Sequence, residues 1–236
     1  EKEIEWAGKF NLRICTLQAS DSPAKMKECP DAPILFFMMG QPVHNRPRGV
    51  AVVGTRRSTP YGKKYCEELI ERLSLCRPKP VIISGLAEGI DSYAHNAALK
   101  YDMETIAVMG TGFDTIFPSC NRKLADKIVE KGAIITEYFP ATAYYPTNFV
   151  RRHRIIAAMA DCILVAESRI KGGGLITARL GFDYNRDVFA VPGKMDDITF
   201  QGCNRLIEEQ IAKIVTSGET ISRIMGWDTA EEQLKI

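Results

Sequence analysis

The sequence predicts an α/β fold with a doubly wound parallel sheet, and two observations support this prediction. Short runs that are apolar throughout, such as GVAVVGT at 49–55 and DCILVAE at 161–167, alternate with longer segments of helical periodicity. Such strands are typical of parallel sheets that helices cover on both faces. A chain of 236 residues with 45% hydrophobic and 25% charged residues can also bury a large core. We therefore expect an extended Rossmann-like domain over about 48–215.

The first 47 residues are expected to extend this sheet. They contain a strand-like run, LRICTL, a short helical segment, SPAKMKEC, and a second strand-like run, ILFFMMG. The proline-containing segment QPVHNRPRG then connects them to the core.

The core is expected to alternate strands with helices. Strands are predicted at 49–55, 80–84, 105–110, 133–138, 161–167 and 187–192. Helices are predicted at 62–76, 91–100, 121–132, 149–160 and 175–185. The first helix places Tyr65, Leu69 and Leu73 on one face, as an amphipathic helix requires.

Helix ends and the C-terminal tail complete the expected organisation. Asp91 and Asn121 are plausible N-caps, and Gly132 suits the end of the third helix. Residues 216–236 are expected to form a helical tail. Since the sequence opens at Glu1 and not at methionine, it is interpreted as a possible fragment.

Glycine-rich and basic segments follow several of the predicted strands. GTRRST follows 49–53, SGLAEGID follows 80–83, and SRIKGGGLIT follows 161–167. The segments 48–66, 138–160 and 168–182 contain lysine or arginine and no acid. Ligands of open parallel sheets bind at the carboxyl ends of the strands. Glycine backbone, helix N-termini and arginine all suit phosphate, so the sequence predicts a phosphate-bearing ligand at this edge.

Three kinds of phosphate ligand could occupy such an edge: a dinucleotide, a nucleotide held by a P-loop, and single-stranded nucleic acid. GTGFDT at 110–115 imitates a dinucleotide fingerprint, but Pro118 follows and no helix begins at once. No P-loop motif is present. Aromatic and basic residues that would suit single-stranded nucleic acid occur together, namely Phe139, Tyr144, Tyr145, Phe149, Arg151, Arg152 and Arg154. The competing interpretations are core packing for Phe149 and an ordinary loop surface for the two tyrosines.

Candidate catalytic and metal-binding groups are few. The seven cysteines form no C-x-x-C pair, so we predict packing roles and reduced cytosolic thiols rather than zinc. Ser84 does not lie in a G-x-S-x-G elbow. His95 suits a core position, and the arginines around His153 would lower its pKa. Glu88 and Asp91 suit loop or helix stabilisation. No catalytic site, metal or cofactor is predicted, and the protein is not expected to be an enzyme.

Many motifs resemble the DNA-processing protein A family, also called DprA or Smf. They include VAVVGTRRSTPYG, ISGLAEGIDSYAHNAAL, TIAVMGTGFDTIFPSCNRKLADKI, TEYFP, NFVRRHRIIAAMAD, GGGLITARLGFDYNRDVFAVPGK and GCNRLI. The resemblance covers about residues 12–215. It implies a cytoplasmic, dimeric protein, without membrane association, that binds single-stranded DNA, protects it in natural transformation and loads RecA recombinase onto it.

The resemblance also implies site residues. Arg56, Phe149, Arg152 and the loop of Lys171, Gly172 and Gly173 match the family's DNA contacts. The full set of predicted DNA-binding residues is Arg56, Arg57, Ser84, Gly85, Phe149, Arg151, Arg152, Arg154, Lys171, Gly172 and Gly173. Leu206, Ile207 and Ile211 are candidates for a dimer interface, with packing against the sheet as the alternative.

The chain also departs from the family pattern. His153 stands where the family usually has asparagine, and Cys203 stands where it usually has threonine. Family members often add a helical domain before the core and a winged helix after it, so 216–236 is a possible linker. Two other function classes remain: a nucleotide-processing phosphoribohydrolase of the lysine-decarboxylase-like type, and a pure oligomerisation module. The first is disfavoured because KGGGLITAR lacks the expected proline and places Arg179 where that class has an acid.

Overall fold

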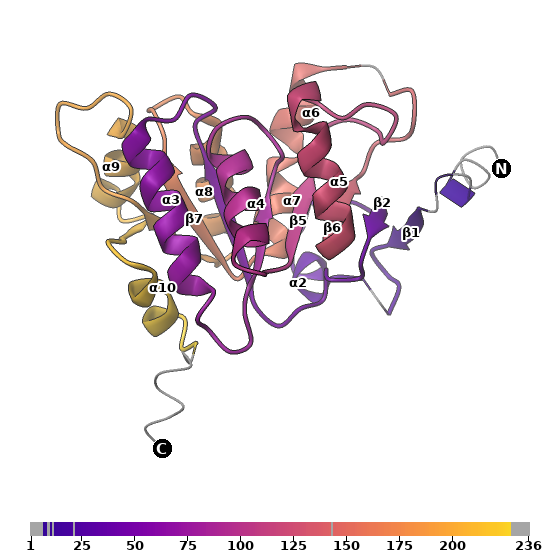
Figure 1. Ribbon diagram of the computed structural model, residues 1–236, viewed down its shortest axis with the longest axis horizontal. Coiled ribbons are helices and arrows are strands. Elements are labelled where there is room, and N and C mark those ends of the chain that lie inside the picture. Colours follow the sequence, from indigo (N-terminus) through magenta and orange to yellow (C-terminus); the bar gives the residue numbers. More distant parts are fainter. Residues whose placement is uncertain (1–6, 9, 11, 21, 143, 228–236) are drawn as a thin grey trace.

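Figure 1 shows the computed structural model, which describes residues 7–8, 10, 12–20, 22–142 and 144–227. The described residues form a single nine-stranded sheet in the order β1-β2-β6-β5-β4-β3-β7-β8-β9. The strands are β1 (Arg13–Thr16), β2 (Leu35–Gly40), β3 (Gly49–Gly54), β4 (Val81–Ser84), β5 (Thr105–Val108), β6 (Ala133–Thr136), β7 (Cys162–Glu167), β8 (Asp187–Ala190) and β9 (Lys213–Ile214).

The predicted doubly wound sheet is confirmed. All pairs from β6 to β9 are parallel, and β3 at the centre pairs with β7 from Val50 opposite Cys162 to Val53 opposite Val165. β2 runs antiparallel to β6, and β1 runs antiparallel to β2. The N-terminal strands therefore continue the sheet beyond β6. The boundaries predicted for the three parts of the chain stay a prediction.

Helices cover both faces of the sheet (Figure 1). They are α2 (Ala24–Lys27), α3 (Pro60–Leu73), α4 (Ile90–Lys100), the 3-10 helix η1 (Ser119–Asn121), α5 (Arg122–Lys131), α6 (Pro146–Arg151), α7 (His153–Met159), α8 (Gly173–Asp183), α9 (Gln201–Glu208) and α10 (Gly218–Ile224). On one face α3, α4 and α5 lie side by side, with α10 against α3; on the other, α7 packs against α8 and α2.

Three predicted details differ from the structure. The single helix expected at 149–160 is divided into α6 and α7, which meet at Arg152. Asp91 is not an N-cap, because α4 begins one residue earlier and Gly89 caps it with φ +76°. Asn121 precedes α5 as predicted but makes no side-chain cap; its amide donates to Leu86 O and Ser92 Oγ. Of the predicted C-terminal tail, 228–236 lie outside the described residues.

The core is built from the fully buried strands and the inner faces of the helices. Six of the seven cysteines are buried in it as free thiols, which confirms the packing role predicted for them; Cys120 is exposed. No helix among the described residues combines the length and the apolar character needed to cross a bilayer.

His95 is buried in α4 with one unpaired nitrogen. The Thr105 hydroxyl donates to Ile82 O at 2.7 Å, so its oxygen accepts a hydrogen bond from His95 Nδ1–H, also at 2.7 Å. Nε2 is left buried without a partner. Burial, with a smaller contribution from the charge of Arg152, lowers the pKa of His95 to about 3. Folding therefore strongly favours the neutral imidazole.

This pKa predicts acid sensitivity. The stability that the neutral His95 contributes is present above pH 6.5, the ordinary pKa, and is lost as the pH falls from 6.5 toward 3. From pH 7 to pH 5 this linkage removes about 2 kcal/mol from the free energy of unfolding. Urea titrations at both pH values should show this drop reduced by that amount in His95→Gln. An identical drop in variant and wild type would contradict the assignment.

Candidate functional site

The candidate site lies where the strand order reverses. From β3 the chain proceeds to β4, β5 and β6 on one side, and later to β7, β8 and β9 on the other. The loops at 55–59, 85–89 and 168–172, which follow β3, β4 and β7, therefore meet at the carboxyl edge of the sheet. This is the position at which open α/β sheets bind ligands.

Two adjoining pockets open at this edge. The first, of about 110 Å³, is called here the ring pocket because aromatic side chains line it; its lining includes Arg56, Glu88, Phe117, Pro118, Phe149 and Arg152. The second, of about 240 Å³, is called the glycine pocket; its lining includes Arg56, Phe149, Arg152, His153, Gly172 and Gly173. The two pockets share Arg56, Ala87, Phe149 and Arg152, so one continuous recess joins distant parts of the chain.

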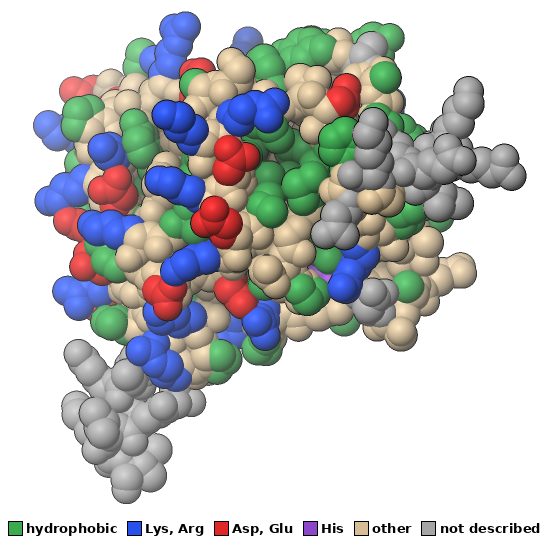
Figure 2. Space-filling model, turned by 45° about the vertical axis from the view of Figure 1, so that its right-hand side comes forward, with side chains coloured by type: hydrophobic (Ala, Val, Ile, Leu, Met, Phe, Trp, Pro, Cys, Tyr) green, Lys and Arg blue, Asp and Glu red, His purple; other side chains and the backbone are tan. Residues whose placement is uncertain are grey.

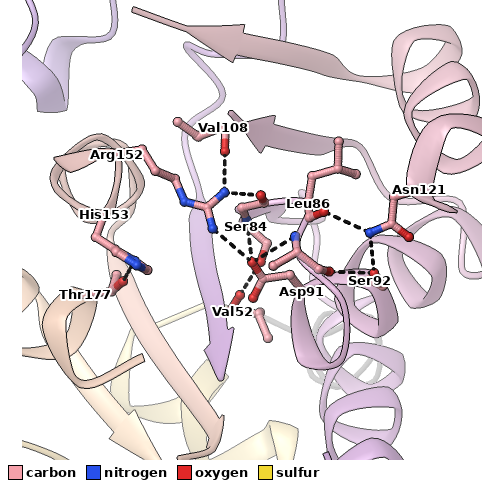
Figure 3. A network of polar contacts seen from close by, with 12 residues as sticks. Val52, Ser84, Leu86, Asp91, Ser92, Val108, Asn121, Arg152, His153 and Thr177 are labelled. Atoms are coloured by element: carbon pink, nitrogen blue, oxygen red, sulfur yellow. Dashed lines mark hydrogen bonds and ion pairs between the residues drawn. The ribbon is translucent and has the colours of Figure 1, made fainter. Parts of the chain in front are cut away.

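A buried ion pair supports the recess (Figure 3). The Arg152 guanidinium donates to Gly85 O and, at 2.8 Å, to Val108 O, and Nη2 lies 3.7 Å from Asp91 Oδ2. The same Asp91 oxygen accepts hydrogen bonds from Gly85 N at 3.1 Å and Ala87 N at 3.4 Å. Burial raises the pKa of Asp91 and lowers that of Arg152, and the opposite charge of each partner offsets part of the shift. The pair thus fixes the loop after β4.

This network favours a structural role for Arg152, and the DNA contact predicted for it stays a prediction. Its side chain is only 3% exposed; Nη1 donates to two carbonyls and Nη2 faces the carboxylate of Asp91, while Nε is buried without a hydrogen-bond partner among the described residues. Although Arg152 lines both pockets, its guanidinium is directed at groups of the protein itself. Through these contacts Arg152 fixes the position of the loop after β4, which lines both pockets.

The prediction for Ser84 is also corrected. Ser84 is fully buried, and its hydroxyl donates to Val52 O at 2.6 Å, which ties β4 to β3. Gly85 does line the ring pocket, but its N–H and C=O are already paired with Asp91 and Arg152. A Cβ at Gly85 would overlap the guanidinium of Arg152. The glycine is therefore required for close packing.

The loop that carries Arg56 and Arg57 is held by a buried carboxylate. Glu167, at the end of β7, accepts hydrogen bonds from Thr59 N and Thr59 Oγ1, both at 2.9 Å through Oε2. Thr59 in turn caps α3. Burial raises the pKa of Glu167, and the hydrogen bonds from Thr59 oppose this. Both arginines are exposed, and neither guanidinium has a protein partner among the described residues.

The three consecutive glycines begin α8 at the edge of the glycine pocket. Gly172 is the N-cap and makes no side-chain cap, so the first backbone N–H groups of α8 lack a side-chain acceptor. A Cβ at Gly174 would lie 3.3 Å from the backbone of Gly54, whereas one at Gly173 would meet only the His153 ring, at 3.3 Å from Nε2. Gly174 thus serves packing, and Gly173 leaves the helix N-terminus accessible to an anion.

The basic residues fall into two groups. Arg56, Arg57, Arg151 and Lys171 are exposed, and none has a hydrogen-bond or ion-pair partner through its side chain within the described part of the chain. Arg154 is different: its side chain is 19% exposed and pairs with Glu137. The predicted phosphate contact by Arg154 is therefore corrected to an internal ion pair. Of the exposed group only Arg56 lines the two pockets, while Lys171 directly precedes the pocket-lining Gly172.

His153 lies in the glycine pocket as a neutral side chain. Its Nδ1 is 2.7 Å from Thr177 Oγ1 (Figure 3). Burial and the neighbouring charges of Arg152 and Arg56 lower the pKa of His153 to about 3, as the sequence predicts in direction. His153 therefore adds no positive charge to the site near neutral pH.

Phe117 is a pocket residue that the sequence prediction did not include. It lines the ring pocket and contacts Phe149, with ring centroids 5.2 Å apart. The only feature of the sequence that could have indicated Phe117 is that it is an aromatic residue in the long loop after β5.

Figure 2 shows hydrophobic side chains bordering a hollow on one face of the molecule, with lysine, arginine and acidic side chains beside it.

The predicted dimer residues lie mostly inside the protein. Leu206 is fully buried and packs in the core, so its assignment to an interface is corrected. Ile207 and Ile211 are partly buried and pack against the same core. Within the described ranges, no group of three or more His, Cys, Asp or Glu side chains could hold a metal ion.

Known proteins match most of the chain. The family profile described as DNA recombination-mediator protein A matches residues 13–226. DNA processing protein DprA of Streptococcus pneumoniae is 41% identical over 199 residues, which are 84% of this chain and 69% of that protein. A solved structure of the S. pneumoniae protein has a TM-score of 0.87 at 36% identity, covering 96% of this chain and 78% of that one.

A second solved structure describes the single-stranded DNA binding mode of DNA processing protein A from Helicobacter pylori. Its TM-score is 0.81 at 26% identity, and the match covers 93% of this chain and 99% of that one. The chain spans between 53% and 70% of the lengths of its curated relatives.

Proposed function

The chain belongs to the DNA recombination-mediator protein A family, and on that premise we propose that it binds single-stranded DNA and loads a RecA recombinase onto it. The observation that carries the proposal is the recess at the strand-order reversal. There, exposed Arg56 and the N-terminus of α8 lie beside aromatic rings. Cations and helix N-termini bind phosphates, and rings stack bases that no complementary strand occupies.

The proposed DNA contacts divide by chemistry. Arg56, Arg57, Arg151 and Lys171 neutralise phosphates, because their charges are exposed and unpaired among the described residues. The backbone at Gly172 and Gly173 receives a phosphate at the start of α8. The single-stranded DNA binding mode of the H. pylori relative supports the same class of ligand.

The wider role follows the family. We propose that the protein acts by binding and not by bond-making, protects incoming strands in natural transformation, and works in the cytoplasm as a homodimer. For the dimer, Ile207 and Ile211 remain candidates because they are only partly buried.

A phosphoribohydrolase-type enzyme is not favoured. Arg179, which stands where that class has an acid, lies in α8 and pairs with Glu209 at 2.7 Å. No specific observation in the described residues supports a catalytic acid at this position.

Binding to matched oligonucleotides tests the proposal. Fluorescence anisotropy with a labelled oligo-dT and with a duplex of equal length, at one salt concentration, should give tighter binding of the single strand. The physical reason is that the ring pocket needs an unstacked base. Equal binding of both, or no binding of oligo-dT, would contradict the proposed function.

A further inference from the structure

Three aromatic rings form a closed cluster beside the ring pocket: Phe117 and Phe149 line the pocket, and Tyr144 contacts both of them. Phe117 and Tyr144 have ring centroids 5.1 Å apart, and each lies 5.2 Å from the ring of Phe149. These separations lie in the favourable range for aromatic pairs. Phe117 comes from the loop after β5, and the other two come from the segment that leads into and forms α6.

The three rings differ in what they can offer a ligand. Phe149 is 7% exposed, whereas Phe117 is 37% and Tyr144 is 53% exposed. The ring of Phe149 also packs on Gly110, where an added Cβ would lie 3.0 Å from Phe149 Cδ1. Phe149 therefore presents only a small part of its surface to the two pockets that it lines, and most of the accessible aromatic surface belongs to Phe117 and Tyr144.

The two outer rings are held by loops that bind each other. Ala141 N donates to Asp114 Oδ2 at 3.2 Å, which joins the loop of Tyr144 to the loop of Phe117. The Thr111 hydroxyl donates to Thr115 O at 2.7 Å and closes the turn that precedes Phe117. Rings that are fixed before binding lose little conformational entropy when a ligand arrives.

Charge next to the rings indicates what they bind. Arg56 lines the same ring pocket and continues into the glycine pocket, where α8 begins. A ligand that spans both pockets would therefore present an apolar, flat group to the rings and an anion to Arg56. A nucleotide within a single strand has this arrangement of base and phosphate.

We propose, resting on the proposed function, that Phe117 and Tyr144 are the platform on which one base of the bound strand stacks. Phe149 supports this platform from inside and does not itself stack the base. This assignment replaces the direct DNA contact that the sequence predicted for Phe149.

Abasic DNA separates stacking from phosphate binding. The probes are a fluorescein-labelled oligo-dT and an oligonucleotide of equal length whose nucleotides lack bases. Phe117→Leu and Tyr144→Leu should each weaken oligo-dT binding by roughly 5- to 150-fold, the range for loss of one stacked base. Their affinities for the abasic strand should stay within about twofold of wild type, because the phosphate contacts remain.

Two control variants match these changes. Tyr144→Phe keeps the ring and should bind oligo-dT like wild type. Tyr145→Leu removes a ring of the same type that is 57% exposed, one position away, and outside the three-ring cluster. It should leave both affinities unchanged. Circular dichroism at the assay temperature checks that each variant is folded. If Phe117→Leu does not fold, Tyr144→Leu still tests the proposal, because Tyr144 is exposed and its replacement should not disturb the core.

The outcomes distinguish this inference from the proposed function. If the leucine variants bind oligo-dT like wild type, or lose oligo-dT and abasic binding equally, the platform assignment is overturned while DNA binding stands. If wild-type protein binds neither strand, the proposed function fails and the platform fails with it.

Discussion

Replacement of Asp91 by alanine is expected to lower the free energy of unfolding by about 3–5 kcal/mol, the cost of leaving a buried charge unpaired. The change removes the carboxylate 3.7 Å from Arg152 Nη2 and strands that guanidinium in the protein interior. It also removes the acceptor of Gly85 N and Ala87 N. Urea denaturation followed by circular dichroism measures the loss.

Glu88→Ala is the matched control for this prediction. It removes one negative charge from the same loop, but Glu88 is exposed, so the expected change is within about 0.5 kcal/mol. The double variant Asp91→Leu with Arg152→Met should recover part of the stability, because no unpaired charge remains buried. A loss in Asp91→Ala no greater than in the control would show that the buried pair does not support the loop.

Joint replacement of Arg56 and Lys171 by alanine is expected to weaken single-stranded DNA binding by about 2–6 kcal/mol. Each contributes a charge-assisted phosphate contact of about 1–3 kcal/mol, and their effects should add if the contacts are independent. Both side chains are exposed and lack protein partners among the described residues, so folding should be unaffected. Anisotropy titrations with labelled oligo-dT measure the change.

The control removes the same charge from elsewhere. Lys127 and Arg223 are exposed, and neither lines the ring pocket or the glycine pocket. Their joint replacement by alanine should alter affinity by no more than about twofold, through the general electrostatic field alone. Equal losses in the two double variants would mean that net charge, and not the recess, governs binding.

The sequence predicted the fold well because the parallel sheet has a strong pattern. Strands buried on both faces, such as 49–54 and 162–167, are apolar along almost their whole length, and Glu167 at the end of the second is the one charged position in the two. The antiparallel direction of β2 was not predictable from its apolar run, since periodicity carries no information on strand direction. The sequence pattern also did not predict that the helix expected at 149–160 divides into α6 and α7 at Arg152.

The sequence predicted a site at the carboxyl edge, where the ring pocket and the glycine pocket open, but it did not predict the contacts of individual arginines. Arg151 and Arg152 are adjacent, yet one is exposed and the other 3% exposed. Helical spacing held a clue: Arg152 follows Phe149 by three positions and precedes Ile156 by four, so it shares their inward face. Its partners, Gly85 O, Val108 O and Asp91, are distant in sequence and could be identified only from the structure.

The aromatic platform was the least predictable feature. Phe117 and Tyr144 lie in loops without periodicity, and their contact depends on how the loops after β5 and β6 fold together. A sequence pattern shows which elements carry an aromatic residue. It does not show which rings remain exposed once the loops are packed.

The salt dependence of oligo-dT binding tests the central claim most directly, namely that exposed cations at the strand-order reversal hold the phosphates of a single strand. If about four phosphates are neutralised, a plot of log K against log salt concentration should have a slope near −3. In the Arg56→Ala, Lys171→Ala variant the slope should become shallower by about 1.4, since two phosphate contacts are lost. A wild-type affinity independent of salt, or an unchanged slope in the variant, would contradict the account.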